Sequence, residues 1–363
     1  MSEVEWAECA PRQAGMDPAG LDRMLALVRA RRSVARLCVL RGGQVVLDRG
    51  FGCGPGAMFW IFSVSKPFVA LLVHRIAEAG QLDLDDPVAA YWPAYARYGK
   101  NTITIRHVLA HRAGVPLASG TLLGDIAMMT SWDRSVRLAE LARPRWPAGQ
   151  VAAYHVLTYG FILGSLLHRI TLAPVASLLA HELLAPYRLR DTYLGIPDAA
   201  WPRRVPVASD NPLEIGRRII VNRRHTRQSV IPAAGISTTA RDLARFYQAV
   251  LDDSRGTGAG ALRRDTVAGA LRPSGRSDWD RLIGRPVRWA HGFQLSGPPG
   301  AVQPMGSKAG SRTFGHNGSS ICNAWADPDR DLVMVYLSNQ LVGRQAGNRH
   351  QSEVSDALLA ACD

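Results

Sequence analysis

The two residues of this chain best suited to chemistry are Ser63 and Lys66, which lie three positions apart in the stretch FWIFSVSKPF. A serine hydroxyl is a weak nucleophile at neutral pH and needs a neighbouring base to accept its proton. A lysine amine can be that base when it is buried at a helix start, because burial and the helix dipole both disfavour the ammonium form. The spacing therefore predicts nucleophilic catalysis, with Ser63 as the nucleophile and Lys66 as the base.

A serine and a lysine at this spacing also occur by chance, as a helix cap followed by a solvated lysine. The amino-acid usage favours the catalytic interpretation. Of the 43 basic residues only three are lysines, namely Lys66, Lys100 and Lys308. A chain that uses arginine almost everywhere keeps at position 66 an amine that can lose its proton, which arginine cannot do.

A helix must position this pair. Residues 64–79 carry an apolar pattern of helical spacing, formed by Val64, Phe68, Leu71, Leu72 and Ile76. Pro67 is compatible with the first turn of this helix, and Gly80 suits the position just after its end. Ser63 therefore lies at the helix N-terminus, with Lys66 one turn further on the same face. The backbone N–H of Ser63 is then available to a developing oxyanion.

The remaining patterns predict strands near both ends of the chain and helices between them. Helices are predicted at 17–31, from about 237–239 onward and at 352–361, and strands at 35–40, 44–49, 288–295, 312–315, 321–326 and 332–337. We therefore expect an α+β fold in which an antiparallel sheet is flanked by helices. Residues 1–80 and 236–363 would form the part with the sheet, and residues 81–235 an inserted, mostly helical subdomain.

The net charge of +13 raises the possibility of nucleic-acid binding, but the arginines are scattered and no zinc-finger, KH or RNP pattern is present. We therefore expect no nucleic-acid partner. One dense group stands out, comprising Arg217, Arg218, Arg223, Arg224 and Arg227. It can be a solvated loop or a docking patch for an acidic substrate or carrier.

Other features bear on compartment and cofactors. The five cysteines are odd in number and lack a C-x-x-C spacing, which is typical of reduced thiols. The acidic N-terminus does not resemble a secretory signal, and no apolar run reaches the length of a membrane span, so we expect a cytoplasmic protein without a membrane partner. His107 and His111 lie four apart on an expected helix but lack a third ligand, so we predict no metal and no cofactor.

Three further motifs, combined with Ser63-Val64-Ser65-Lys66, carry a resemblance to a known family. They are YHVLTYG (154–160), HNGS (316–319) and AHRAG (110–114), with GQLDLDDP (80–87) and GISTTARDL (235–243) as additional matches. With these motifs in their order along the chain, it resembles the serine β-lactamase-like superfamily, which includes class C β-lactamases, D-alanyl-D-alanine peptidases and carboxylesterases. The resemblance extends over about residues 14–340. The tyrosine motif and YWPAYARYGK (91–100) are most similar to the carboxylesterase branch, often called family VIII.

The resemblance implies a β-lactamase/transpeptidase-like fold with the active site in a cleft between the sheet and the helical region. It identifies Ser63 as the nucleophile, Lys66 as its base and Tyr154 as a proton shuttle to the leaving group. The backbone N–H groups of Ser63 and Ser319 would form the oxyanion hole. The residues expected to contact substrate are His155, Val156, His316, Asn317, Gly318 and Ser319.

Two departures from the family pattern bear on the substrate. Val156 stands where β-lactamases and peptidases usually have an asparagine that holds an amide, and valine neither donates nor accepts a hydrogen bond. His316 stands where β-lactamases have a lysine that grips a carboxylate. Both departures favour esters or similarly activated small-molecule acyl donors, with transfer to water by a carboxylesterase or to a small amine or alcohol by a transacylase, for example in specialised metabolism.

Two alternatives remain open from the sequence. The chain could be an amide hydrolase of the D-alanyl-D-alanine peptidase or β-lactamase type. It could also be a scaffold that binds without chemistry, although the presence of Ser63, Lys66 and Tyr154 together argues against this. The sequence identifies neither the acyl donor nor the oligomeric state.

Overall fold

The computed structural model describes residues 6–258, 260–275 and 278–362. Within these residues the main sheet has eight antiparallel strands in the order β2-β1-β12-β11-β10-β9-β8-β7. The strands are β1 (Ala35–Arg41), β2 (Gln44–Phe51), β7 (Asp278–Asp280), β8 (Arg285–Trp289), β9 (Gln294–Leu295), β10 (Phe314–Gly318), β11 (Cys322–Asp327) and β12 (Leu332–Ser338). The central pairing of β1 with β12 joins the two ends of the chain, so the prediction of one antiparallel sheet flanked by helices is confirmed.

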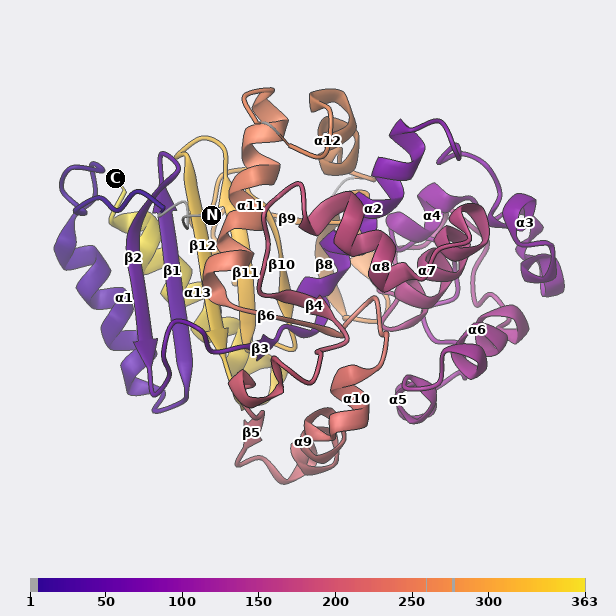
Figure 1. Ribbon diagram of the computed structural model, residues 1–363, viewed down its shortest axis with the longest axis horizontal. Helices are drawn as coiled ribbons and strands as arrows, with labels where there is room; N and C mark the ends of the chain where they lie inside the picture. Colours follow the sequence, from indigo (N-terminus) through magenta and orange to yellow (C-terminus); the bar gives the residue numbers. More distant parts are fainter. Residues whose placement is uncertain (1–5, 259, 276–277, 363) are drawn as a thin grey trace.

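Helices cover both faces of this sheet. Helices α1 (Pro18–Ala30) and α13 (Arg344–Ala360) pack together on one face, over a core that includes Met24, Trp325 and Leu358. Helix α11 (Ala240–Arg255), capped by Thr239, packs against β1, β11 and β12 on the other face. Figure 1 shows α11 in front of the strands and α13 behind them. The result is a three-layer arrangement.

Helix α2 (Lys66–Glu78) lies between the sheet and the helical part of the molecule, and it packs against α7 (Thr158–Thr171) and α12 (Arg264–Leu271). We expected one apolar face on this helix. Instead every residue from Lys66 to His74 is buried, because neighbours cover the helix on all sides. Lys66 is therefore an amine inside a hydrophobic core.

The segment between residues 81 and 235 is mostly helical, as expected. Its helices are α3 (Val88–Tyr91), η2 (Pro93–Thr102), α4 (Ile105–Leu109), α5 (Leu122–Met128), α6 (Trp132–Leu141), α7, α8 (Val175–Leu179), η3 (Ala180–Leu184), η4 (Trp201–Arg203), η5 (Pro212–Glu214), α9 (Ile215–Asn222) and α10 (Arg224–Gln228). Two short strands in this segment, β4 (Thr192–Leu194) and β5 (Ala208–Ser209), pair with strands outside it, β6 (Ile236–Thr238) and β13 (Gln340–Leu341). The division into two parts at residues 80 and 235 stays a prediction.

Several boundaries differ from those expected from the sequence. Helix α13 begins at Arg344, eight residues before the predicted start, because its first turns are polar and carry no apolar stripe. The strand expected at 288–295 is two strands, β8 and β9, joined by a turn, and β7 was not predicted at all. His111 lies beyond the end of α4 in the left-handed region, with φ of 57°, so it does not share a helix face with His107.

No single helix within the described residues is long and apolar enough to cross a membrane. Helix α7 and the Val175–Leu184 segment pass such a test together, but an 85° bend separates them. The buried residues of α7, from Thr158 to Leu167, pack inside the protein. Cys38 and Cys322 are buried free cysteines.

Candidate active site

A short strand and a strained turn hold Ser63 at the start of α2. Strand β3 (Phe59–Trp60) pairs with β6 and leads into the 3₁₀ turn η1 (Phe62–Ser65). Phe62 has φ of 49°, an uncommon conformation for a bulky residue, and such strain is often found at functional sites. Strand β10 approaches this turn so closely that a Cβ at Gly318 would lie 2.2 Å from the backbone oxygen of Ile61. Gly318 therefore sets the distance between the serine turn and the sheet.

The amine of Lys66 is fully buried beside this serine. Its Nζ lies 3.5 Å from Ser63 Oγ, 2.8 Å from the backbone oxygen of Val156 and 3.3 Å from that of Ala233. Burial lowers the pKa of Lys66 well below its ordinary value. A neutral amine has two N–H donors and one lone pair, so two carbonyl acceptors leave the lone pair for the serine hydroxyl. The geometry suits a base.

Tyr154 lies beside the same two residues. Lys66 Nζ is 4.6 Å from the centre of its ring. Burial raises the pKa of the Tyr154 hydroxyl, and its hydrogen-bonding contact with Ser63 opposes that shift. The phenol therefore keeps its proton at neutral pH and is available as a proton donor. Its ring stacks on Trp289 of β8, with centroids 5.3 Å apart and planes at 12°.

Asp280, which was not anticipated from the sequence, anchors Tyr154. This fully buried carboxylate accepts hydrogen bonds from the backbone N–H of Tyr154 at 3.1 Å and from the indole of Trp289 at 2.9 Å. It also accepts from the backbone of Leu282 and Ile283. Asp280 thus holds the tyrosine segment on the β7–β8 hairpin. The signal that could have revealed it is an aspartate that starts a turn toward Gly284.

Two buried histidines lie behind Tyr154. The backbone N–H of His155 donates to Nδ1 of His111 at 3.1 Å, and Nδ1 of His155 contacts the backbone oxygen of Ala153 at 2.7 Å. Burial lowers the pKa of His155 to about 3 and that of His111 well below its ordinary value, so both rings are neutral. His155 is in the interior and does not line the cavity, so the geometry gives no support to its predicted contact with substrate.

The reactive groups open into a cavity of about 290 Å³. The predicted residues that line it are Ser63, Tyr154, Val156, His316, Asn317 and Ser319. Gly318 does not line it, since that residue faces the serine turn. The lining residues that sequence reasoning did not assign to the site are Leu117, Leu122, Leu282, Ile283, Arg285, Trp289, Gln294, Ser320, Arg344 and Asn348.

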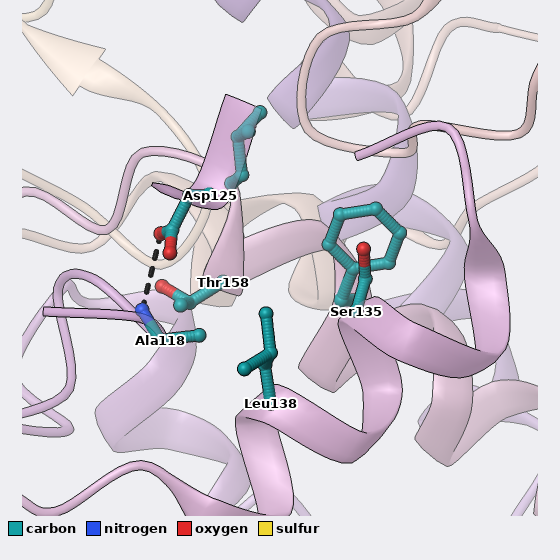
Figure 2. A pocket seen from close by; sticks show the side chains of 7 residues that line it. Ala118, Asp125, Ser135, Leu138 and Thr158 are labelled. Atoms are coloured by element: carbon teal, nitrogen blue, oxygen red, sulfur yellow. Dashed lines mark hydrogen bonds between the residues drawn. The ribbon is translucent and has the colours of Figure 1, made fainter. Parts of the chain in front are cut away.

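A second pocket, shown in Figure 2, has room for about 10 Å³ and is too small for a substrate. Its Asp125 accepts a hydrogen bond from the backbone N–H of Ala118 at 3.1 Å, drawn in Figure 2. It accepts another from the backbone N–H of Ser119 at 2.7 Å. The carboxylate therefore fixes the loop that carries Leu117, at the edge of the larger cavity, to α5. The residues of this pocket therefore have a structural role.

His316, on β10, lines the cavity as a neutral side chain. Burial is the main cause that lowers its pKa to about 3. Its Nδ1 contacts the backbone oxygen of Asn317 at 2.7 Å, which requires a proton on Nδ1, and its buried Nε2 has no partner among the described residues. His316 can thus accept a hydrogen bond through Nε2, but it supplies no fixed positive charge.

Ser319 sits in a tight turn between β10 and β11. Ser319 and Ser320 have φ of 50° and 58°, and the backbone N–H of Ile321 donates to the oxygen of Gly318 at 3.0 Å. Such a turn usually carries Asn-Gly, so two serines store strain there. The Ser320 hydroxyl donates to Asn348 of α13 at 2.9 Å. This contact holds the turn in place at the cavity wall.

The predicted group of arginines from 217 to 227 does not form one patch. Arg217 lines the cavity and pairs with Glu214 at 2.7 Å. Arg227 is fully buried, and its side chain donates to the backbone oxygens of Val221 and Val205. Arg224 pairs with Asp198 outside the cavity. Arginines that are neighbours in the sequence thus lie in three different environments.

The two histidines considered for a metal pair each have another role. His107 caps α4, with its Nδ1 accepting from the backbone N–H of Thr104 at 3.2 Å. His111 accepts from His155, as described above. No group of three metal-ligating side chains occurs in the part of the chain that the structure describes.

The model of the Beta-lactamase family matches residues 20–358. The esterase/beta-lactamase LipL of Mycobacterium tuberculosis is 29% identical over 342 residues, which cover 84% of this chain and 77% of LipL.

Two solved structures share the fold. A family VIII carboxylesterase has a TM-score of 0.79 at 23% identity, with 95% of this chain and 98% of that chain covered. The protein EstCE1, described as a hydrolase with promiscuous acyltransferase activity, has a TM-score of 0.77 at 19% identity, covering 94% and 98% of the two chains.

Proposed function

The chain belongs to the Beta-lactamase family of serine hydrolases, and we propose from this premise that it transfers acyl groups through an acyl-Ser63 ester. The proposed donors are small-molecule esters or similarly activated acyl compounds. The observation that carries the proposal is the environment of Lys66, whose Nζ has two carbonyl acceptors and lies 3.5 Å from Ser63 Oγ. The relative LipL, named as an esterase/beta-lactamase, supports ester chemistry.

In the acylation step, Ser63 Oγ forms a bond to the acyl carbon while its proton passes to Lys66 Nζ. The backbone N–H groups of Ser63 and Ser319 donate hydrogen bonds to the carbonyl oxygen, on which negative charge develops. The bond to the leaving oxygen then breaks, and Tyr154 gives that oxygen its proton. Lys66 returns a proton to the phenol. The raised pKa of Tyr154 supports this order, because the phenol is protonated when the leaving group needs it.

In deacylation the acceptor is the nucleophile and Ser63 Oγ is the leaving group. Water, or a small alcohol or amine, attacks the acyl carbon of the Ser63 ester and gives a proton to the neutral Lys66 amine or, through Tyr154, to the same base. Ser63 Oγ leaves and takes a proton back. A second nucleophile intercepts the ester whenever the cavity binds it ahead of water.

The cavity walls favour esters over β-lactam amides. The Val156 side chain lines the cavity and can form no hydrogen bond with a substrate amide. His316 is neutral, so it cannot hold a carboxylate as a strand lysine would. Loss of such a polar contact costs roughly 1–3 kcal/mol, which lowers kcat/KM for the β-lactam by about 10- to 100-fold.

Mass spectrometry of the intact protein tests the proposal. The protein is mixed with a panel of 4-nitrophenyl esters, thioesters and β-lactams, and the reaction is quenched in acid. We expect the ester to add one acyl group, on a peptide that contains Ser63, and Ser63→Ala to remain unmodified and inactive. Turnover of esters by folded Ser63→Ala at the parent rate would refute the assignment of the nucleophile.

The acceptor is tested by partitioning of the same acyl-enzyme. Rising concentrations of small amines and alcohols are added with a reactive ester, and transferred product is measured against free acid. Saturable transfer that suppresses hydrolysis indicates a transacylase, and transfer that stays linear with acceptor concentration indicates a carboxylesterase. The description of EstCE1 motivates this comparison.

A further inference from the structure

Three arginines line the cavity that contains Ser63, and they come from elements far apart in the sequence. Arg217 lies on α9, Arg285 begins β8 and Arg344 begins α13. Their charges act on one another. Burial is the largest cause that lowers the pKa of Arg217 and of Arg285, and the positive charge of Arg344 lowers both further. Like charges gathered at one wall oppose folding unless a counter-charge compensates them.

The protein supplies little of that counter-charge. The pair between Arg217 and Glu214 is the one ion pair that these three arginines make within the described residues. Asp280 lies near Arg285 and raises its pKa, but the carboxylate already accepts four hydrogen bonds from the tyrosine segment and the β7–β8 hairpin. Two guanidinium groups at the cavity wall thus lack a carboxylate of their own.

Two N–H donors of these arginines also lack a hydrogen-bond acceptor within the described residues. The Nε atoms of Arg217 and Arg285 are buried and have no hydrogen-bond partner in the described part of the chain. At the buried Arg227 the corresponding Nε does have an acceptor, since Nε and one terminal nitrogen each donate to a backbone oxygen at 3.0 Å, and only its Nη1 has no partner among the described residues. A buried donor without an acceptor is costly, and an oxygen-rich anion in the cavity would satisfy it.

One of these arginines contacts Ser319, which is expected to contribute to the oxyanion hole. Arg217 Nη1 donates to Ser319 Oγ at 3.5 Å, and Ser319 shares the cavity with Ser63. We propose that Arg217, Arg285 and Arg344 form an anion-binding subsite, and that the acyl substrate carries a carboxylate or phosphate away from the bond that Ser63 attacks. The substrate part of this proposal rests on the proposed function. Guanidinium groups bind both anions through paired hydrogen bonds.

A pair of esters matched in length tests the subsite by kinetics. Mono-4-nitrophenyl glutarate and 4-nitrophenyl pentanoate have acyl chains of the same length, and the glutarate alone ends in a carboxylate. We expect the parent protein to prefer the glutarate by about tenfold or more in kcat/KM, the effect of one charge-assisted hydrogen bond. The preference should fall toward unity in Arg285→Gln and in Arg344→Gln, and it should weaken as salt is added.

Arg349→Gln is the matched control, because this arginine lies on α13, is exposed and is not among the residues that line the cavity. It should keep the parent preference. Equal kcat/KM for the two esters in the parent, or the same preference in all the variants, would overturn the subsite. Thermal unfolding of each variant checks that it is folded.

Calorimetric titration separates failure of the subsite from failure of the proposed function. Inorganic phosphate and glutarate are titrated into the parent, Arg285→Gln, Arg344→Gln and Arg349→Gln proteins without any ester. We expect binding that weakens about tenfold in the first two variants and not in the third, and the tighter anion identifies the natural group. Arginine-dependent binding without an acyl-Ser63 ester would refute the function and leave the subsite. An acyl-Ser63 ester without anion binding would refute the subsite alone.

Discussion

Two fully buried lysines, Lys66 and Lys100, sit in similar surroundings and differ in the number of acceptors around them. Lys66 Nζ donates to two backbone oxygens, and its third neighbour is a hydroxyl. Lys100 Nζ donates to three backbone oxygens, those of Arg97 at 2.9 Å, Glu140 at 2.9 Å and Ala142 at 2.6 Å. Both amines also lie over tyrosine rings, so contact with aromatic rings does not distinguish them.

The acceptor count sets the protonation state that each environment favours. Three carbonyl acceptors are satisfied by an ammonium group with three donors, whereas two acceptors suit a neutral amine whose lone pair faces Ser63. Burial lowers the pKa of Lys100 to about 8, with the charge of Glu140 opposing, so this lysine stays charged at neutral pH. Lys100 caps the end of α6 as an ammonium, and Lys66 is placed to act as a base.

Replacement of the base should have the largest effect on activity. Lys66→Met has about the same volume and no proton acceptor, so kcat/KM for a 4-nitrophenyl ester should fall by about 10³-fold. Stability at neutral pH should change little, because two carbonyl oxygens lose their donor while folding no longer strips a proton from an amine that is charged in the unfolded chain. Ester kinetics and urea denaturation measure the two effects. A variant that keeps more than a tenth of the parent rate would show that Lys66 is not the base.

Replacement of Lys100 should lower stability and leave activity almost unchanged. Lys100→Met leaves three buried carbonyl oxygens without their donor, and the free energy of unfolding should fall by about 3 kcal/mol. Activity of the remaining folded protein should stay within about threefold of the parent. Urea denaturation and ester kinetics on the same preparation measure both. An equal loss of activity in Lys100→Met and Lys66→Met would remove the distinction between the two lysines.

The pH dependence of activity should reflect Lys66. Burial lowers its pKa, and the neutral amine is the active form, so kcat/KM should be low in acid, rise about tenfold per pH unit and level off well below the ordinary lysine value of about 10.4. His316 titrates near pH 3 and should not contribute at neutral pH. A profile measured from pH 4 to 10 tests this. A rise centred near pH 10 would mean that the buried amine is an ordinary ammonium.

The features of the site and fold that depend on local spacing could be predicted from the sequence. Ser63, Lys66 and the helix that carries them follow from a ten-residue stretch, and the sheet follows from strand patterns at both ends of the chain. The family motifs identified Tyr154 and the β10 strand. These features depend on neighbours in the chain or on motifs that keep their order.

The parts that depend on long-range packing could not be read in this way. Asp280, Arg285 and Arg344 join the site through the pairing of β7 with β8 and the earlier start of α13, and both elements have weak or polar patterns. The structural role of Lys100 could not be predicted, because its three acceptors come from two separate segments. His155 was expected to contact substrate as part of the tyrosine motif, but long-range packing buries it against His111 and Ala153.

The most direct test of the central claim is NMR titration of the lysine side chains. The chain has three lysines, so protein labelled with ¹³C and ¹⁵N lysine gives three sets of side-chain signals, which Lys→Arg variants assign. We predict that Lys66 is neutral at pH 7 and titrates well below Lys100, which should titrate near pH 8. The account is contradicted if Lys66 remains an ammonium at pH 7 under conditions in which the enzyme turns over its ester at full rate.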